Sequence, residues 1–464
     1  MFRIKISHIN VCLIVCFLFF SACGSGKKAQ KTPSPPVKKE GKVKSINDNT
    51  MQEKVEDLTE NKPTPTIFTP DVNDLKEVKN LPDTHSLSDA QIASSFNIAI
   101  MLPFNVSNYY PNEAYDSIPK KSRMALEYYE GILVALDNLR GKGFDYNVQV
   151  YDTENNTAKV SQILSEPEMK NMNLIIGPIY NRPLKTVADF ARQHQIYHVS
   201  PLSPSKKVTY NNPYYLVANP SVETHCAAMY EYMNQNFSNK KIIVIGGNDS
   251  QEQNLSSLFY QFANNNNSSE SYPSVDITQV VYTDQSEEDL ETYFSPNQQN
   301  IVVITSFKEL QVANILRKIH FFHDRYQIAL FGMPNWRNLE ALDLDYLVNL
   351  NFHISSSVWV NEFSAEHQQF KHAYQAKFNT FPSKNAIKGY DLMGSFAQIM
   401  QTYGTNFGLY LNEINQKGVY VNYSFEPSSL NKYKNSSIIT TDFMENMELH
   451  ILKYRSDYRF EKAN

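Results

Sequence analysis

The spacing of histidines and carboxylates is the first guide to the chemistry of this chain. His320 and His323 lie three residues apart in a helical pattern, as a metal-binding pair would, but no carboxylate cluster accompanies them. Two solvated histidines at a helix end are the simpler interpretation. Glu287, Glu288 and Asp289 stand at a helix start, where negative charge complements the helix dipole. We therefore expect no metal and no cofactor.

Motifs for phosphate binding, dinucleotide binding and covalent catalysis are also missing. The sequence contains no Gly-x-Gly-x-x-Gly after a strand, no Gly-x-x-x-x-Gly-Lys-Ser/Thr, no Gly-x-Ser-x-Gly and no His-Glu-x-x-His. Dispersed acids could still form a hydrolase pair, because carboxylates that meet in space need no local motif. We predict a non-catalytic protein and keep a cell-wall enzyme as the alternative.

The composition is that of a mildly acidic globular protein. The 464 residues carry a net charge of −5 and are 42% hydrophobic and 12% aromatic. At about 100–200 residues per domain, this length suits two lobes with a sizeable core. The chain has no basic excess, so nucleic acid is not an expected partner. Of the four cysteines, only Cys226 lies beyond residue 23, in a helical pattern that predicts a buried small side chain and no internal disulfide.

The amino terminus has the layout of an export signal that ends at a cysteine. A basic start, with Arg3 and Lys5, precedes an apolar run over 11–20. This run is too short for a membrane-spanning helix, which needs ~20 residues. Phe20-Ser21-Ala22-Cys23 resembles the bacterial lipobox, which implies that 1–22 is a lipoprotein signal peptide and that Cys23 receives acyl chains such as palmitate. The alternative is an ordinary signal peptide with a chance cysteine near the cut.

A polar segment separates this signal from the first apolar run. Residues 23–95 contain few large apolar residues and are rich in Lys and in Pro, at Pro33, Pro35, Pro36, Pro63, Pro65 and Pro70. Such a segment buries too little surface to offset its ordering entropy, so we expect a disordered linker. A flexible linker of ~70 residues typically spans about 50 Å. It would hold the folded body on a long tether, although a spacer of unselected length is the alternative.

From Phe96 onward, short apolar runs alternate with helical patterns. The first series of predicted strands and helices is 96–104, 123–139, 146–151, 157–172, 174–178, 183–193 and 196–199. The second is 222–237, 241–247, 253–263, 277–282, 287–294, 301–305, 310–322 and 328–331. The remainder predicts a strand at 352–360, helices at 366–378 and 388–403, and strand-like stretches at 419–425, 438–443 and 448–454. This alternation predicts an α/β fold with parallel sheets covered by helices.

Several short motifs occur in order along the body, at 98–103, Gly131 within 129–132, 148–152, 175–178, 199–203 and Gly389-Tyr390-Asp391. In their order and spacing they resemble the motifs of type I periplasmic binding proteins, the leucine-binding-protein-like family. The resemblance implies two Rossmann-like lobes with parallel central sheets, a hinge of several crossings and a ligand cleft between the lobes. We expect lobe 1 at 96–220, completed by about 354–415, and lobe 2 at 221–353, completed by part of 416–464.

In this fold, ligands bind beyond the carboxyl ends of the parallel strands. The resemblance implies that the ligand-binding residues are Asn105, Tyr180, Asn181, Ser200, Ser203, Ser205, Asn248, Asp249, Trp336 and Tyr390. In family members that bind amino acids, small residues offer N–H and hydroxyl groups to the α-carboxylate, as the three serines can here. The loop at 180–183 departs from the family, because its side chains are bulky and Pro183 has no N–H to donate.

Two functions remain open within this resemblance. One is the solute-binding lipoprotein of an ABC-type uptake or sensing system, with an amino acid or small polar solute as ligand and an ABC permease as partner. The other is a penicillin-binding-protein activator, a lipoprotein branch of the same fold that docks on a cell-wall synthase. Both imply a place in the cell envelope, on the periplasmic side of a bacterial membrane, with the lipid anchor as the membrane contact. We expect the outer membrane to carry that anchor.

Overall fold

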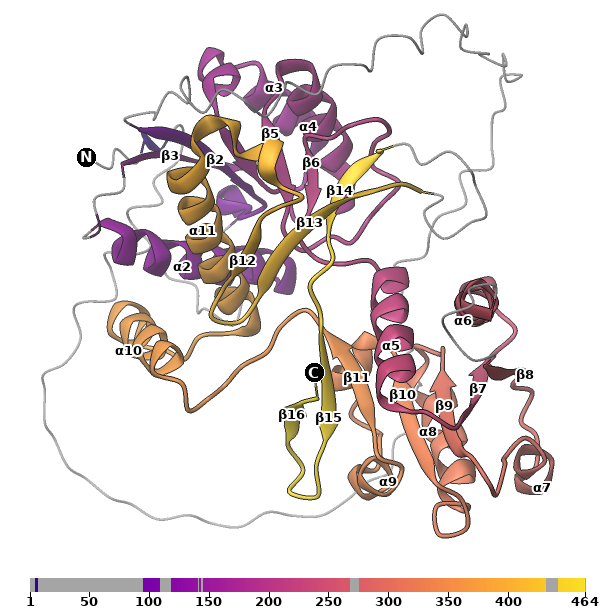
Figure 1. Ribbon diagram of the computed structural model, residues 1–464. Helices are drawn as coiled ribbons and strands as arrows, with labels where there is room; N and C mark the ends of the chain where they lie inside the picture. Colours follow the sequence, from indigo (N-terminus) through magenta and orange to yellow (C-terminus); the bar gives the residue numbers. More distant parts are fainter. Residues whose placement is uncertain are drawn as a thin grey trace, which may run out of the picture. The chain divides into compact units, whose positions relative to one another are not determined.

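Two sheets organise the part of the chain that the computed structural model describes (Figure 1). The described residues are 5–6, 95–108, 118–140, 142, 145–267, 275–430 and 441–463, with the backbone alone at 5–6 and 265–267. The predicted α/β class with mostly parallel strands is confirmed. The lipobox with Cys23 lies outside the described residues, as do the signal peptide and linker apart from Lys5, Ile6 and Ser95.

The first sheet has nine strands in the order β1-β3-β2-β4-β5-β6-β14-β13-β12. Neighbours from β1 to β14 pair in parallel, whereas β13 pairs antiparallel with both β14 and β12. The strands are β1 (Lys5–Ile6), β2 (Phe96–Leu102), β3 (Tyr146–Asp152), β4 (Leu174–Ile176), β5 (Tyr197–Ser200), β6 (Tyr215–Val217), β12 (Asn415–Lys417), β13 (Asn422–Ser428) and β14 (Phe443–Asn446). We call this sheet and the helices packed on it lobe 1.

Helices cover both faces of the lobe 1 sheet. They are α2 (Lys120–Arg140), α3 (Thr157–Leu164), α4 (Asn181–His194), α10 (Ala365–Phe378) and α11 (Lys384–Tyr403), with short 3₁₀ turns at Val106–Asn108, Pro167–Asn171 and Gly404–Tyr410. In β2, Ile98 and Ile100 pack with α2, α10 and α11, whereas Ala99 and Met101 pack with α3 and α4. Successive side chains of a strand point to opposite faces, so a strand covered on both sides must be apolar throughout. This explains the unbroken apolar run of β2.

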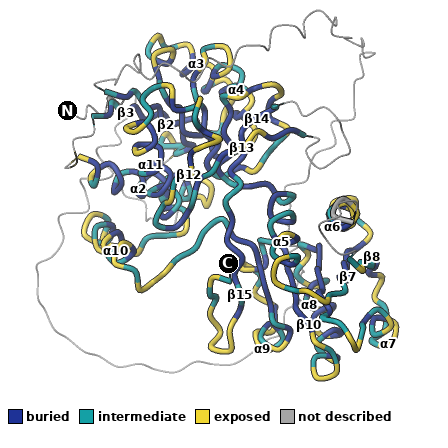
Figure 2. The backbone as a smooth tube through the Cα atoms, viewed as in Figure 1, coloured by how far each residue is buried: buried dark blue, intermediate teal, exposed yellow. Residues whose placement is uncertain are grey.

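The second sheet has seven strands in the order β16-β15-β11-β10-β9-β7-β8. The strands are β7 (Lys240–Gly246), β8 (Asp276–Val281), β9 (Gln299–Ile304), β10 (Ile328–Gly332), β11 (His353–Ser356), β15 (His450–Tyr454) and β16 (Phe460–Lys462). The helices are α5 (Val222–Asn236), α6 (Ser250–Asn267), α7 (Glu287–Glu291), α8 (Glu309–His320), α9 (Leu344–Asn349) and the 3₁₀ turn η6 (Pro334–Asn338). This sheet and its helices form lobe 2. Its inner strands are largely buried, whereas the edge strands β8 and β16 and the outer helix faces are more exposed (Figure 2).

One expectation about a single element of lobe 2 can be compared with the structure. Cys226 is a free, buried thiol within α5, as its helical setting predicted. Burial raises the pKa of this thiol well above its ordinary value, so the reactive thiolate is disfavoured. Within the described residues, no helix combines the length and apolar character needed to span a bilayer.

The chain passes between the two sheets three times, after β6, after β11 and after β14. The three crossings lie side by side. Asn446 Nδ2 donates to the carbonyl of Ala218 at 3.2 Å, and Ser357 Oγ donates to Asn219 Oδ1 at 3.4 Å. Because all three connections run together, they supply a common hinge line for the two lobes.

Candidate functional site

Asp152, the last residue of β3, shapes the loop that follows β2. Its Oδ1 accepts the N–H of Asn105 at 3.0 Å and its Oδ2 accepts that of Val106 at 2.9 Å. Asn105 has a left-handed backbone, with φ of 55°, and its Nδ2 donates to Pro103 O at 3.0 Å and Ser122 Oγ at 2.9 Å. The predicted ligand residue Asn105 therefore uses its amide donors to hold its own loop at the carboxyl end of the strand.

The predicted serines after β5 do come together with Asn181 at the start of α4. Ser203 Oγ donates to Asn181 Oδ1, and the N–H of Ser205 donates to Ser203 Oγ at 3.2 Å. Ser200 is fully buried, and its Oγ donates to the carbonyl of Ser203 at 3.1 Å. These hydrogen bonds join the loops after β4 and β5 into one surface, with Asn181 and Ser205 at its accessible side.

The two predicted tyrosines lie in different surroundings. Tyr180 precedes α4, and its hydroxyl donates to Lys121 O at 3.2 Å while the Lys121 ammonium lies 5.5 Å from its ring. Tyr390 packs against Phe370 of α10, with ring centroids 4.4 Å apart, and its hydroxyl accepts Asn138 Nδ2 at 3.1 Å. Tyr180 thus borders the lobe 1 strand ends, whereas Tyr390 belongs to the packing between α11, α2 and α10.

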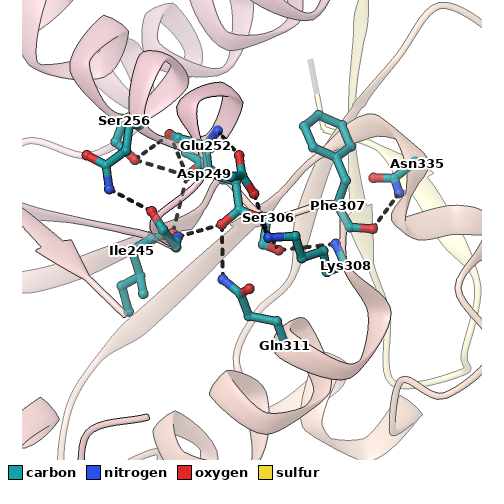
Figure 3. Close-up of polar contacts among 12 residues, drawn as sticks. Ile245, Asp249, Glu252, Ser256, Ser306, Phe307, Lys308, Gln311 and Asn335 are labelled. Atoms are coloured by element: carbon teal, nitrogen blue, oxygen red, sulfur yellow. Dashed lines mark hydrogen bonds and ion pairs between the residues drawn. The ribbon is translucent and has the colours of Figure 1, made fainter. Parts of the chain in front are cut away.

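In lobe 2, a buried carboxylate gathers the loops after β7 and β9 (Figure 3). Glu252, on α6, is 2% exposed. Its Oε2 accepts the N–H of Gly247 at 2.5 Å and Gln311 Nε2 at 3.0 Å. Its Oε1 accepts Ser306 Oγ at 3.0 Å and lies 3.4 Å from Lys308 Nζ. A buried charge needs such partners, so this network fixes the geometry of both loops.

Asp249 completes the network at its solvent side. Lys308 Nζ donates to Asp249 Oδ2 at 2.6 Å, and Asp249 Oδ1 caps α6 by accepting the N–H of Glu252 at 2.8 Å. Burial acts to raise the pKa of Asp249. The hydrogen bonds from Glu252 and Lys308 have the larger, opposite effect, so the pKa of Asp249 lies below its ordinary value. The bond to Asp249 correspondingly raises the pKa of Lys308. Of the two residues predicted here, Asp249 is engaged in this ion pair and Asn248 is exposed.

Sequence reasoning missed Glu252, Ser306, Lys308 and Gln311. One local signal was present, because Asp249-x-x-Glu252 has the spacing of a capping box at a helix start. The structure uses only half of that motif. Asp249 caps the helix, whereas the Glu252 side chain turns to Gly247.

Trp336, the predicted aromatic residue of lobe 2, is buried in the lobe. It is 2% exposed, its Nε1 donates to Ser306 O at 3.0 Å, and its ring stacks on Phe352 at 5.6 Å. A Cβ on Gly332 would meet the Trp336 ring, so glycine is required at this strand end. The neighbouring Asn335 donates Nδ2 to Phe307 O at 3.4 Å. Trp336 therefore helps to hold the loop at 305–308 in place through its hydrogen bond to Ser306.

Three basic residues that the sequence did not single out meet near the crossings. Arg337 belongs to η6 of lobe 2, and Lys384 and Lys388 lie one turn apart on α11 of lobe 1. Lys384 Nζ donates to Asn338 Oδ1 at 3.2 Å, which brings the start of α11 against η6. Lys388 Nζ donates to Asn219 Oδ1 at 3.4 Å, on the first crossing.

The histidine pair considered for zinc is part of an aromatic stack. The His320 ring lies 4.3 Å from that of His323 and 4.1 Å from that of Tyr346. Among the described residues, no three His, Cys, Asp or Glu side chains are grouped in a way that could hold a metal ion.

Comparison with known proteins gives a family and a fold. The family model described as periplasmic binding protein matches residues 123–408, more than half of the chain. No curated protein sequence matches this chain.

Three solved structures illustrate the shared fold. A putative branched-chain amino acid ABC transporter from Rhodospirillum rubrum is 12% identical, with a TM-score of 0.55 over 80% of this chain and 100% of that one. An ABC transporter substrate-binding protein from Desulfitobacterium hafniense is 15% identical, with a TM-score of 0.52 and the same coverage. A branched chain amino acid ABC transporter periplasmic ligand-binding protein from Burkholderia xenovorans is 9% identical, with a TM-score of 0.51 over 80% of this chain and 94% of that one. At these identities, the likeness concerns the fold.

Proposed function

This chain belongs to the periplasmic binding protein family, and we propose that it is the solute-binding lipoprotein of an ABC-type uptake or sensing system. It would hold an amino acid or another small polar solute without changing it, so it is not an enzyme. It would work in the cell envelope, tethered through acylated Cys23 and the linker at 23–95, and an ABC permease would be its partner.

The observation that carries this proposal is the arrangement of polar loops at the strand ends of two hinged lobes. In lobe 1, Ser203, Ser205 and Asn181 form one hydrogen-bonded surface. In lobe 2, Glu252 and Lys308 hold the loops after β7 and β9. Ligands of open α/β sheets bind beyond the carboxyl ends of their strands, and two such lobes on a hinge can close on a small molecule.

The first prediction concerns the tether. Cys23→Ser removes the thiol that the acyl chains require, so the variant should move from the membrane fraction to the soluble fraction of the cell envelope. Immunoblotting of fractionated cells measures this. Ser21→Thr, which leaves the cysteine in place, is the control, and a Cys23→Ser protein that stays in the membrane would rule out the anchor.

A binding screen tests the proposed function against docking on a cell-wall synthase. The full-length protein would be purified in detergent and examined by native mass spectrometry for retained solutes, then by thermal shift against amino acids, organic acids and sugars. A specific solute supports the proposal. Absence of any bound solute, together with co-purification of a peptidoglycan synthase from crosslinked cells, would instead assign the protein to the activator role.

A further inference from the structure

Three basic side chains from the two lobes lie close together. We call them the cationic trio: Arg337, Lys384 and Lys388. Arg337 stands on η6 beyond the carboxyl end of β10, and the two lysines stand one turn apart on the first turns of α11. Residues four apart on a helix share a face. The bond from Lys384 to Asn338, the residue beside Arg337, joins these two elements. Arg337 and Lys384 are exposed, so a solute can reach them.

Within the described residues, the hydrogen bonds of the trio go to neutral oxygens. Arg337 Nη1 donates to Ser356 Oγ at 3.2 Å, Lys384 to Asn338 Oδ1, and Lys388 to Asn219 Oδ1. The guanidinium of Arg337 also lies 5.4 Å from the Phe460 ring. An aromatic ring attracts a guanidinium without neutralising its charge.

Glu445 of β14, beside the third crossing, is hydrogen-bonded to neutral donors. Glu445 accepts the N–H of Ser221 at 2.8 Å, Thr224 Oγ1 at 2.7 Å and Ser428 Oγ at 2.9 Å. Neutral donors from lobe 1, the first crossing and α5 of lobe 2 therefore use three of its four acceptor positions. It is a structural carboxylate rather than the counter-ion of the trio.

Lys384 lies close enough to both Arg337 and Lys388 for their positive charges to oppose one another. Burial, and then the charge of Lys384, lower the pKa of Lys388 to about 8. Partial desolvation, and then the charge of Arg337, lower the pKa of Lys384. Burial, and then the charge of Lys388, also lower the pKa of the nearby His225, to about 3. Like charges held together in this way cost free energy that an anion would recover.

We propose that Arg337, Lys384 and Lys388 bind the oxyanion group of the solute, a carboxylate or a phosphate, and that this group draws the two lobes together. This inference rests on the proposed function. A guanidinium binds such oxyanions through paired N–H groups, and each ammonium adds a compact charge. Three cations favour a dianion, such as a dicarboxylate or a phosphate, over an aliphatic amino acid with no net charge.

The test is calorimetric titration of the full-length protein at pH 7 and constant ionic strength. The probes are succinate, inorganic phosphate and leucine, so that the two oxyanion sources are measured separately. We expect succinate or phosphate to bind at least about tenfold more tightly than leucine. Arg337→Gln and Lys384→Gln should each weaken that binding by about tenfold or more, as the loss of one charged hydrogen bond predicts.

Lys388→Met separates a binding role from a structural one. It should weaken anion binding while raising the melting temperature of the ligand-free protein, because it removes repulsion within the trio. If Lys388 served only to stabilise the fold, its replacement would instead lower the melting temperature of the ligand-free protein. Lys170→Gln, the same charge change at an exposed site on the turn at Pro167–Asn171, should alter neither quantity.

The outcomes distinguish this inference from the proposed function. If neither anion binds at about 10 mM, or if the Arg337 and Lys384 variants bind the anion as tightly as the natural protein, the cationic site is refuted. Tight binding of leucine or another neutral solute, unchanged in these variants, would refute the site and leave solute binding intact. If no solute of any charge binds, solute binding itself fails as well.

Discussion

Asp391 shows how a residue of a family-like motif can serve the fold. Its Oδ2 accepts the N–H groups of Tyr420 at 2.5 Å and Val421 at 2.6 Å, and its Oδ1 accepts that of Val419 at 3.1 Å. The side chain leaves α11 and holds the turn before β13. Burial outweighs these three donors and raises the pKa of Asp391 to about 6.

The raised pKa of Asp391 predicts a dependence of stability on pH. An aspartate in the unfolded chain titrates near 3.9, so the folded state binds the proton more tightly. The contribution of this group to stability is fully present below pH ~4 and is lost as the pH rises through about 6, by ~3 kcal/mol. Asp391→Asn does not titrate. The unfolding free energy of the natural protein minus that of the variant should therefore fall from pH 4 to pH 7 in urea denaturation.

The control for this experiment is Asp276→Asn, at an exposed position at the start of β8. Its difference from the natural protein should be small across the same range, because this side chain is exposed to solvent in the folded protein. A pH-independent difference for Asp391→Asn would show that this carboxyl is not shifted in the folded protein.

At the scale of elements, the packing of α2 against α11 depends on two glycines. A Cβ on Gly131 would collide with Ala386 O of α11, and a Cβ on Gly389 would collide with Tyr128 O of α2. Each helix thus presents a glycine to the backbone of the other. Close backbone approach, rather than ligand binding, is the role that the structure shows for the glycine of Gly389-Tyr390-Asp391.

Two substitutions in α11 test this packing. Gly389→Ala should lower the unfolding free energy by about 1–3 kcal/mol or more, because the methyl group forces the helices apart. Gly394→Ala is the matched control. A Cβ there meets nothing within 4 Å, so it should stabilise the protein by up to ~1 kcal/mol through helix propensity. Chemical denaturation measures both changes in unfolding free energy. Equal effects of the two substitutions would contradict the close contact between α2 and α11.

The long, periodic elements were the predictable ones. The pattern at 123–139 corresponds to α2, and the pattern at 157–172 corresponds to α3 and the 3₁₀ turn at Pro167–Asn171. Short elements with little periodicity were missed, including β6 and α9. The strand expected at 352–360 ends at Ser356, because Ser357 begins the crossing between the lobes.

At the scale of the whole molecule, Trp359 offers a reporter of lobe movement. It lies on the second crossing, and its side chain packs against the hydrophobic core of lobe 2. Its backbone N–H donates to the carbonyl of Tyr420, in lobe 1, at 2.9 Å. A change in the angle between the lobes would alter the surroundings of this indole.

Tryptophan fluorescence therefore tests hinge closure. The chain has two tryptophans, and Trp336 is buried in lobe 2. A solute that closes the lobes should shift the emission, and Trp359→Phe should remove most of that shift while the affinity stays the same. If Trp336→Phe removes the shift instead, the change arises within lobe 2 and not at the hinge.

The sequence by itself determined the α/β class and the two series of strands and helices. It could do so because hydrophobic periodicity records which face of each element is buried. Local sequence also predicts the lipobox and the linker, and both remain predictions. Tertiary structure alone decided which polar groups meet. Glu252 with Ser306, and Arg337 with Lys384, are far apart in the chain and are joined only by the sheet order and the three crossings.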